Sequence, residues 1–226
     1  MIARLAANLR EHPSRWAAGF LVLLFLFWPV DIDVSRVYYI PGTGFTWSTD
    51  GVLEFVRVAV PDVIIASYVL CVLLWLAGLA KRDLVWRVTP PAILYLTLTL
   101  LIGPGLIAEG LLKPFWGRAR PKDIAEFGRA AAYTPPWKIA AECDHNCSFV
   151  SGHAAVAYWV AAYAMLLPAR WRAAGIFAGV VFGLAVGMVR VAQGAHFFSD
   201  IVGAGLIVIL VNAALARLIL DRKPAL

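Results

Sequence analysis

The chain has 226 residues, of which 62% are hydrophobic and only 15% are charged. This balance lies outside the range of ordinary soluble proteins, and the length suits one domain, so we expect a single membrane-embedded domain over residues 1–226. The net charge of +6 is not accompanied by a basic patch with interleaved exposed aromatic residues, so no nucleic-acid partner is predicted.

Six apolar runs near the length of a bilayer core predict an all-α, polytopic protein with six transmembrane helices. They cover residues 16–30, 58–80, 88–112, 153–169, 173–190 and 201–220. The first run follows Arg4, Arg10 and Arg15 as a secretory signal would, but it has no small-x-small cleavage pattern. We therefore interpret it as an uncleaved first span.

The basic residues predict the orientation. With the N-terminus in the cytoplasm, the inner segments hold eleven of the twenty Lys and Arg residues and three acidic residues, a net of 11 − 3 = +8. The outer segments hold nine basic and eleven acidic residues, a net of −2. The positive-inside rule then places both termini in the cytoplasm. The inner basic residues are Arg4, Arg10, Arg15, Lys81, Arg82, Arg87, Arg170, Arg172, Arg217, Arg222 and Lys223.

The first outer loop, residues 31–57, contains the turn-rich sequence Pro41-Gly42-Thr43-Gly44. Further along, Gly103-Pro104-Gly105 should bend the third span. This span leaves the membrane through Glu109 and Lys113, which are four residues apart and can pair on one helical face.

A long outer loop, residues 114–150, follows the third span and contains Cys143, His145 and Cys147. Three interpretations stay open: a small disulfide-closed loop, a Cys-x-His-x-Cys metal site, or free thiols. A fourth metal ligand is not evident.

The first of three polar clusters runs from Lys113 to Arg120-Pro121. A Lys and an Arg with six residues between them can turn two cations toward one anion, and a guanidinium binds phosphate oxygens through a bidentate fork. Arg118 is a third candidate. The alternative for the whole cluster is attraction to lipid headgroup phosphates.

The second cluster, Ser151-Gly152-His153, stands where the outer loop becomes the fourth span. A helix N-terminus offers free backbone N–H groups to an anion, Gly152 lets that backbone approach closely, and the Ser151 hydroxyl can donate another bond. A capping Ser followed by an interfacial His is the alternative.

The third cluster comprises Arg190, His196 and Asp200. His196 and Asp200 are four residues apart, so we expect the carboxylate to accept a hydrogen bond from Nδ1 and leave Nε2 as a nucleophile. In the predicted topology all three clusters meet the same, outer membrane face. Together they supply the positive charges and imidazoles that phosphoryl transfer requires.

These three clusters, in this order, resemble the three-part signature of the type 2 phosphatidic-acid phosphatase superfamily. The resemblance implies that His196 attacks phosphorus to form a phosphohistidine, Asp200 orients and charges His196, and His153 protonates the leaving oxygen. It further implies that the phosphoryl oxygens are held by Lys113, Arg120, Arg190, Ser151 and the Gly152 amide. The chain departs from the pattern at Val150, where Pro is usual, and at Val189, where Ser is usual.

The expected function is therefore a lipid phosphatase of the bacterial inner membrane that acts at the periplasmic surface without a metal or other cofactor. The surroundings of the first two clusters are similar to those of bacterial members that act on lipid A. Undecaprenyl diphosphate and phosphatidylglycerophosphate are the alternative substrates. Rival functions are a lipid phosphotransferase with the same histidine chemistry, a haloperoxidase that holds vanadate, and a non-catalytic membrane protein that binds or transports anionic lipid. The sequence specifies no oligomeric state.

Overall fold

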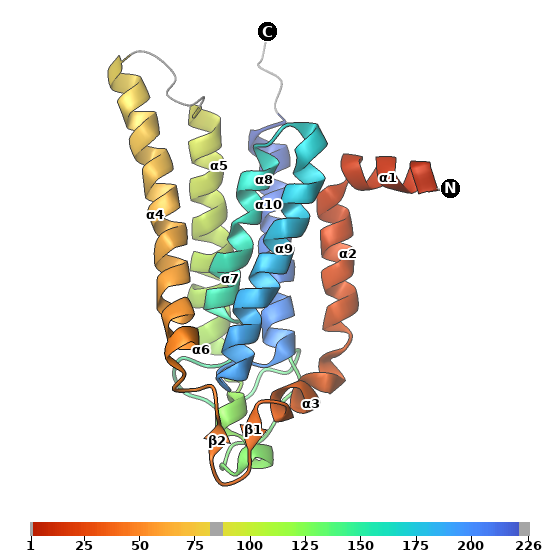
Figure 1. Ribbon diagram of the computed structural model, residues 1–226, viewed down its shortest axis with the longest axis vertical. Helices are drawn as coiled ribbons and strands as arrows, with labels where there is room; N and C mark the ends of the chain where they lie inside the picture. Colours follow the sequence, from red (N-terminus) through yellow and green to blue (C-terminus); the bar gives the residue numbers. More distant parts are fainter. Residues whose placement is uncertain (1, 82–87, 222–226) are drawn as a thin grey trace.

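The computed structural model describes residues 2–81 and 88–221, and it shows helices packed side by side with a small cap at one end (Figure 1). The inner-side residues Arg82, Asp83, Arg87, Arg222 and Lys223 of the predicted orientation lie outside the described residues.

The chain begins with two helices at a steep angle to each other (Figure 1). Helix α1 (Ile2–Glu11) points sideways away from one end of the bundle, and α2 (Pro13–Phe25) runs along the bundle. Proline at the first position of α2 suits a helix start, because that position needs no N–H donor. The chain then bends by 54° into η1 (Trp28–Val30) and α3 (Asp31–Arg36) at the opposite end.

The turn-rich sequence in the first outer loop forms a short hairpin. Strands β1 (Tyr39–Ile40) and β2 (Gly44–Phe45) pair antiparallel, with Tyr39 opposite Phe45. Helix α4 (Gly51–Lys81) follows and begins at residue 51, not near the predicted residue 58. The Asp50 carboxylate accepts the backbone N–H groups of Val52 and Leu53 at 3.0 and 2.9 Å, and this cap explains the earlier start.

The third predicted span is continuous but changes its helical type. Helix α5 (Pro90–Leu100) passes into the π-helix η3 (Leu101–Leu112) and ends in α6 (Lys113–Phe115). Pro104 has no N–H to donate, so the regular α-helical hydrogen bonding is interrupted at this point.

The long outer loop covers the end of the bundle with little regular structure. It contains two short 3₁₀ turns, η4 (Pro121–Asp123) and η5 (Ala125–Phe127). Cys143 and Cys147 form a disulfide, with their Cα atoms 5.6 Å apart. The disulfide leaves neither sulfur free, so the alternatives of a metal site and of free thiols were wrong.

Four helices after this loop form the centre of the bundle: α7 (Gly152–Trp159), α8 (Ala161–Met165), α9 (Ala169–Ala192) and α10 (Phe198–Ile219). Three glycines at four-residue intervals in α9 allow this close packing. A Cβ atom at Gly179, Gly183 or Gly187 would lie within 2.8 Å of Ala161, Tyr158 or Ile201, respectively. This stripe of small residues brings the outer ends of α7, α9 and α10 together.

Four helices are long and apolar enough to cross a membrane, and the bent pair of α2 with α3 would make a fifth, among residues 2–81 and 88–221. The fourth predicted span, 153–169, is divided at Val160 into α7 and α8, each too short to cross alone. The protein is therefore mostly helical, with four to five candidate spans where six were predicted.

Candidate active site

Five of the eight predicted site residues line one cavity of about 340 Å³, which we call the catalytic cavity. They are Lys113, Arg120, His153, Arg190 and His196. The elements that carry them converge at the end of the bundle opposite α1 (Figure 1).

Each of these five side chains comes from the end of a helix or from a loop beside one. Lys113 begins α6, His153 is the second residue of α7, and Arg190 lies in the last turn of α9. His196 lies in the five-residue connection between α9 and α10, at residues 193–197, and Arg120 immediately precedes η4. Helix packing therefore gathers residues that are up to 83 positions apart (196 − 113).

The catalytic cavity is strongly positive. Its lining includes five cations, Arg57, Lys113, Arg120, Lys122 and Arg190, against a single carboxylate, that of Glu54. So many like charges around one small space favour a bound anion, because it relieves their mutual repulsion.

Most of these cations are held by a partner at the cavity wall. Lys113 Nζ lies 2.8 and 3.0 Å from the two carboxylate oxygens of Glu109, which confirms the predicted pair. Arg120 donates from Nε and from Nη2 to the Asn146 carbonyl, at 3.0 and 2.6 Å. Arg190 donates to the Gln193 side chain. These contacts fix the cations while leaving them further N–H groups for a ligand.

His196 is oriented differently from the prediction. Its Nδ1 lies 2.7 Å from the Ser148 backbone carbonyl and 3.8 Å from Asp200, so the expected hydrogen bond to the carboxylate was wrong. A carbonyl only accepts, so Nδ1 carries the proton and Nε2 of the neutral ring keeps its lone pair. The Ser148 carbonyl thus does what Asp200 was expected to do.

The Asp200 carboxylate is occupied by other donors. It accepts from the Ser148 hydroxyl at 2.5 Å, from the Phe197 backbone N–H at 2.8 Å, and from Arg118. Asp200 therefore connects Ser148 of the outer loop to Phe197, the residue after His196, by hydrogen bonds. Its charge remains close to the His196 ring.

Arg118 stands at the centre of a fully buried network behind the catalytic cavity. It pairs with Asp200 on one side and with Asp31 on the other, at 2.9 Å from the latter, and all three side chains have 0% exposure. Asp31 also accepts from Ser199, whose backbone N–H lies at 2.8 Å and whose hydroxyl lies at 2.5 Å. Two carboxylates and one guanidinium leave a net charge of −1 beside His196.

Burial and the neighbouring charges shift the pKa values of His196 and Arg118 in opposite directions. Burial lowers the pKa of His196 below its ordinary value, and Asp200 only partly opposes this effect. Burial also lowers the pKa of Arg118, but Asp200 and Asp31 raise it by more, so its pKa lies above the ordinary value. The ring is therefore neutral and the guanidinium charged near neutral pH.

Ser151, Gly152 and Asp200 lie behind the catalytic cavity and do not line it. Ser151 caps α7, because its hydroxyl accepts the Ala154 N–H at 3.4 Å. Gly152 leaves room for Glu109, since a Cβ atom there would lie 1.7 Å from a Glu109 oxygen. Ser151 thus fixes the start of the helix that carries His153, and Gly152 makes room for the pair of Lys113 with Glu109.

Several residues at or behind the catalytic cavity were not predicted from the sequence or were given another role, and Lys122 is one of them. Arg57 and Glu54 lie in the first turns of α4, in a stretch assigned to a loop, and pair through Arg57 Nε at 2.7 Å. Asp31 had no predicted role, and Arg118 was considered only as a phosphate or lipid contact. A carboxylate at the edge of an apolar run indicates that a buried partner pairs with it, and Asp31 stands at such an edge, directly after residues 16–30.

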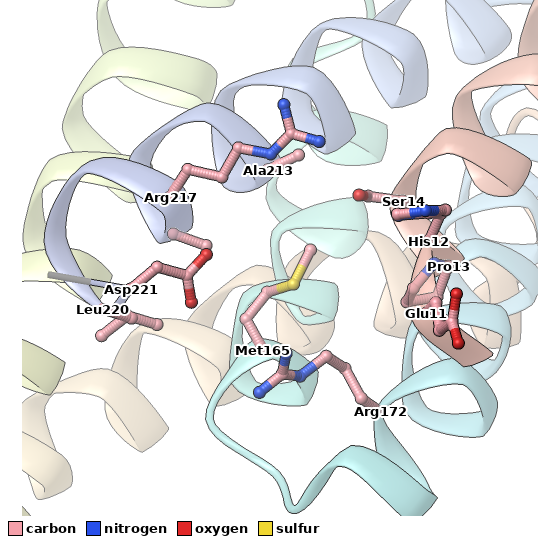
Figure 2. A pocket seen from close by; sticks show the side chains of 11 residues that line it. Glu11, His12, Pro13, Ser14, Met165, Arg172, Ala213, Arg217, Leu220 and Asp221 are labelled. Atoms are coloured by element: carbon pink, nitrogen blue, oxygen red, sulfur yellow. The ribbon is translucent and has the colours of Figure 1, made fainter. Parts of the chain in front are cut away.

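A second polar cavity, of about 290 Å³, lies at the other end of the bundle beside the junction of α1 and α2. Figure 2 shows Glu11, His12, Arg172, Arg217 and Asp221 around it. We call it the opposite cavity. Within the described part of the chain, no hydrogen bond or ion pair joins these five side chains.

Comparison with known proteins agrees with the geometry. Residues 91–224 match the family described as the PAP2 superfamily. The chain is 42% identical over 118 residues to the lipid A 4'-phosphatase of Francisella tularensis subsp. novicida (strain U112), covering 52% of this chain and 53% of that protein. It is 38% identical over 120 residues to the lipid A 4'-phosphatase of Rhizobium leguminosarum, covering 53% and 52%.

The chain thus spans about half the length of the curated relatives it matches. No solved structure matches it.

Proposed function

Because the chain belongs to the PAP2 superfamily, we propose that it is an integral-membrane lipid phosphatase whose active site is the catalytic cavity. The observation that carries this proposal is the lining of that cavity, in which two imidazoles face a space surrounded by five cations. Such a site stabilises the charge of a transferring phosphoryl group and provides both a nucleophile and a proton donor.

In the proposed reaction, His196 Nε2 attacks phosphorus, an N–P bond forms, and the P–O bond to the lipid breaks. His153 gives its proton to the leaving lipid oxygen. In the second step His153 takes a proton from water, the water oxygen attacks phosphorus, and the N–P bond breaks to release phosphate. The buried net charge of −1 from Arg118, Asp31 and Asp200 would stabilise the positive ring of the intermediate.

Phosphoryl oxygens would be held chiefly by Lys113, Arg120 and Arg190, which line the cavity. Ser151 and the Gly152 amide, at the N-terminus of α7, stay proposed donors to a phosphate that enters deeper than the present cavity wall, behind which they lie. The chemistry proposed for these side chains needs no metal or other cofactor.

We place the site at the periplasmic face of the bacterial inner membrane, with both termini in the cytoplasm. The basic residues of α1 and of the first turn of α2 support this orientation, since these parts of the chain, which carry Arg4, Arg10 and Arg15, lie at the end of the bundle away from the catalytic cavity. Six crossings result if α7 and α8 together count as one span and α2 with α3 as another, within one membrane domain over residues 1–226.

The substrate would be a phosphorylated membrane lipid that reaches the cavity from the side, between helices. Lipid A, undecaprenyl diphosphate and phosphatidylglycerophosphate all carry the required group. The names of the curated relatives favour lipid A.

The test is phosphate release by the purified protein in detergent with EDTA, on those three lipids and phosphatidic acid. We expect release from at least one lipid, and a loss of at least about 10³-fold in His196→Ala. His12→Ala, in the opposite cavity, is the matched control and should retain full activity. A folded wild-type protein that releases nothing, or a His196→Ala variant that remains active, would refute the proposal.

A further inference from the structure

A third cavity, of about 550 Å³, adjoins the catalytic cavity and is larger than it. The two cavities share three lining residues, Ser48, Lys122 and Gln193. We call the additional space the outer cavity, because the β1–β2 hairpin that lines it lies beyond the ends of the long helices (Figure 1). The two cavities are therefore adjacent, and a ligand that passes these three residues would occupy both.

The walls of the outer cavity are attached to the connection that carries His196. Phe45 of the hairpin packs on Gly194, where a Cβ atom would lie 2.4 Å from its ring and where φ is +67°. On the other wall, the Lys122 backbone N–H donates to the Gly194 carbonyl at 3.0 Å. The two cavities therefore keep a fixed relation to each other and to the proposed nucleophile.

The lining of the outer cavity suits a polar group that bears negative charge. Lys122 and Arg129 are exposed cations, and Asp123 is the one carboxylate among the lining residues, so the net charge is +1. Neither cation forms an ion pair with another described residue. The hydroxyls of Thr43 and Ser48, the Gln193 amide and the Asp123 carboxylate add the donors and acceptors that match sugar hydroxyls.

The position of this cavity restricts the substrate. In phosphatidic acid, phosphatidylglycerophosphate or a prenyl diphosphate, the scissile phosphate is the end of the headgroup, and every other atom leads back toward the membrane. Such a lipid would leave the outer cavity unused, because the cavity lies on the side away from the helices. A headgroup that branches at the sugar bearing the scissile phosphate can fill it.

We propose that the outer cavity is a subsite for the remainder of a phosphorylated glycolipid headgroup, in which Arg129 and Lys122 bind a second phosphate. The inference rests on the proposed function, and it selects a sugar lipid with two phosphates from the candidate substrates.

The test separates binding from turnover. The protein carrying His196→Ala should bind lipid without hydrolysing it, and its affinity is measured in detergent for bisphosphorylated lipid A, for monophosphorylated lipid A and for phosphatidic acid. Adding Arg129→Gln should weaken binding of the bisphosphorylated lipid about tenfold, because one charge-assisted contact is lost. The other two lipids should change by less than about twofold.

Two further variants make the result specific. Thr43→Trp, in the exposed hairpin turn, fills the outer cavity and should weaken both forms of lipid A but not phosphatidic acid. Arg36→Gln removes an exposed outer cation that lines neither cavity and should change nothing. Equal effects of Arg129→Gln on all three lipids, or no effect on any, would overturn the subsite. The proposed function fails separately, if the wild-type protein releases no phosphate.

Discussion

The catalytic cavity and the opposite cavity are similar in what lines them. They measure about 340 and 290 Å³, and each has arginines, at least one histidine and at least one carboxylate at its wall. They differ in what stands behind that wall. His196 is 2% exposed and Asp200 is fully buried, and both are held by hydrogen bonds to the adjoining segments.

At the opposite cavity such support is absent from the described residues. Buried Nε atoms without a hydrogen-bond partner occur at both ends, in Arg172 and in Arg190, but at the opposite cavity His12 also precedes α2 without a capping hydrogen bond from its side chain. Polar side chains at a cavity wall are therefore common to both ends of the molecule, whereas a preorganised set is found at one. Variants that affect the support should consequently have large effects at one end and small effects at the other.

The largest effect, a loss of folding stability, is expected from Arg118→Gln. This change leaves Asp31 and Asp200 buried without their cation, and breaking a buried pair in this way typically costs about 3–5 kcal/mol. Thermal unfolding in detergent should show the loss, while Arg172→Gln at the opposite cavity should cost less than about 0.5 kcal/mol. Equal stability of the two variants would contradict the difference between the two ends.

Asp200→Asn should lower kcat about 10²-fold while the protein stays folded. An Asn oxygen can still accept from Ser148 and Phe197, but the negative charge beside His196 is lost, and the proposed phosphohistidine would be less well stabilised. Steady-state phosphate release measures the change, with Asp221→Asn at the opposite cavity as its matched control. Unchanged kcat in Asp200→Asn would show that this carboxylate has only a structural role.

Gly152→Ala should lower kcat/KM only by about twofold to fivefold. The new methyl group overlaps the Glu109 carboxylate, which is the flexible end of a partly exposed side chain and can turn away. Lys113 then loses the partner that fixes it. Glu109→Ala/Gly152→Ala should be no less active than Glu109→Ala alone, because the overlap is gone. A further loss of kcat/KM in the double variant would mean that Gly152→Ala acts by changing the backbone of α7 and not through Glu109.

Residue order and residue type predicted the helices and the gathering of Lys113, Arg120, His153, Arg190 and His196, because each stands at the outer end of an apolar run. Partners within the buried network could not be predicted in the same way. Asp31 and Arg118 are 87 positions apart, and no local pattern connects them. The Ser148 carbonyl could not be predicted for a similar reason. Every residue has the same backbone carbonyl, and only the fold decides which one meets His196.

The division of the fourth span had another cause. Hydropathy counts apolar residues and does not register a break in helical hydrogen bonding, such as that at Val160 between α7 and α8. In the same way, the start of α4 depended on the Asp50 cap and not on the beginning of the apolar run.

The smallest expected effect is a shift in the titration of the His196 ring. It is also the most direct test of the hydrogen bonds and charges that surround this residue. Because burial lowers the pKa, the midpoint of its titration should lie below 6.5, and the ring should be neutral with its proton on Nδ1 above that midpoint. Nitrogen NMR of histidine-labelled protein reports both quantities, and the spectrum of His196→Gln identifies the signal. Asp200→Asn should move the midpoint lower still, because the carboxylate favours the charged ring. A midpoint above 6.5 would mean that the charge of Asp200 outweighs burial at this histidine, and a neutral ring protonated on Nε2 would contradict its hydrogen bond to the Ser148 carbonyl.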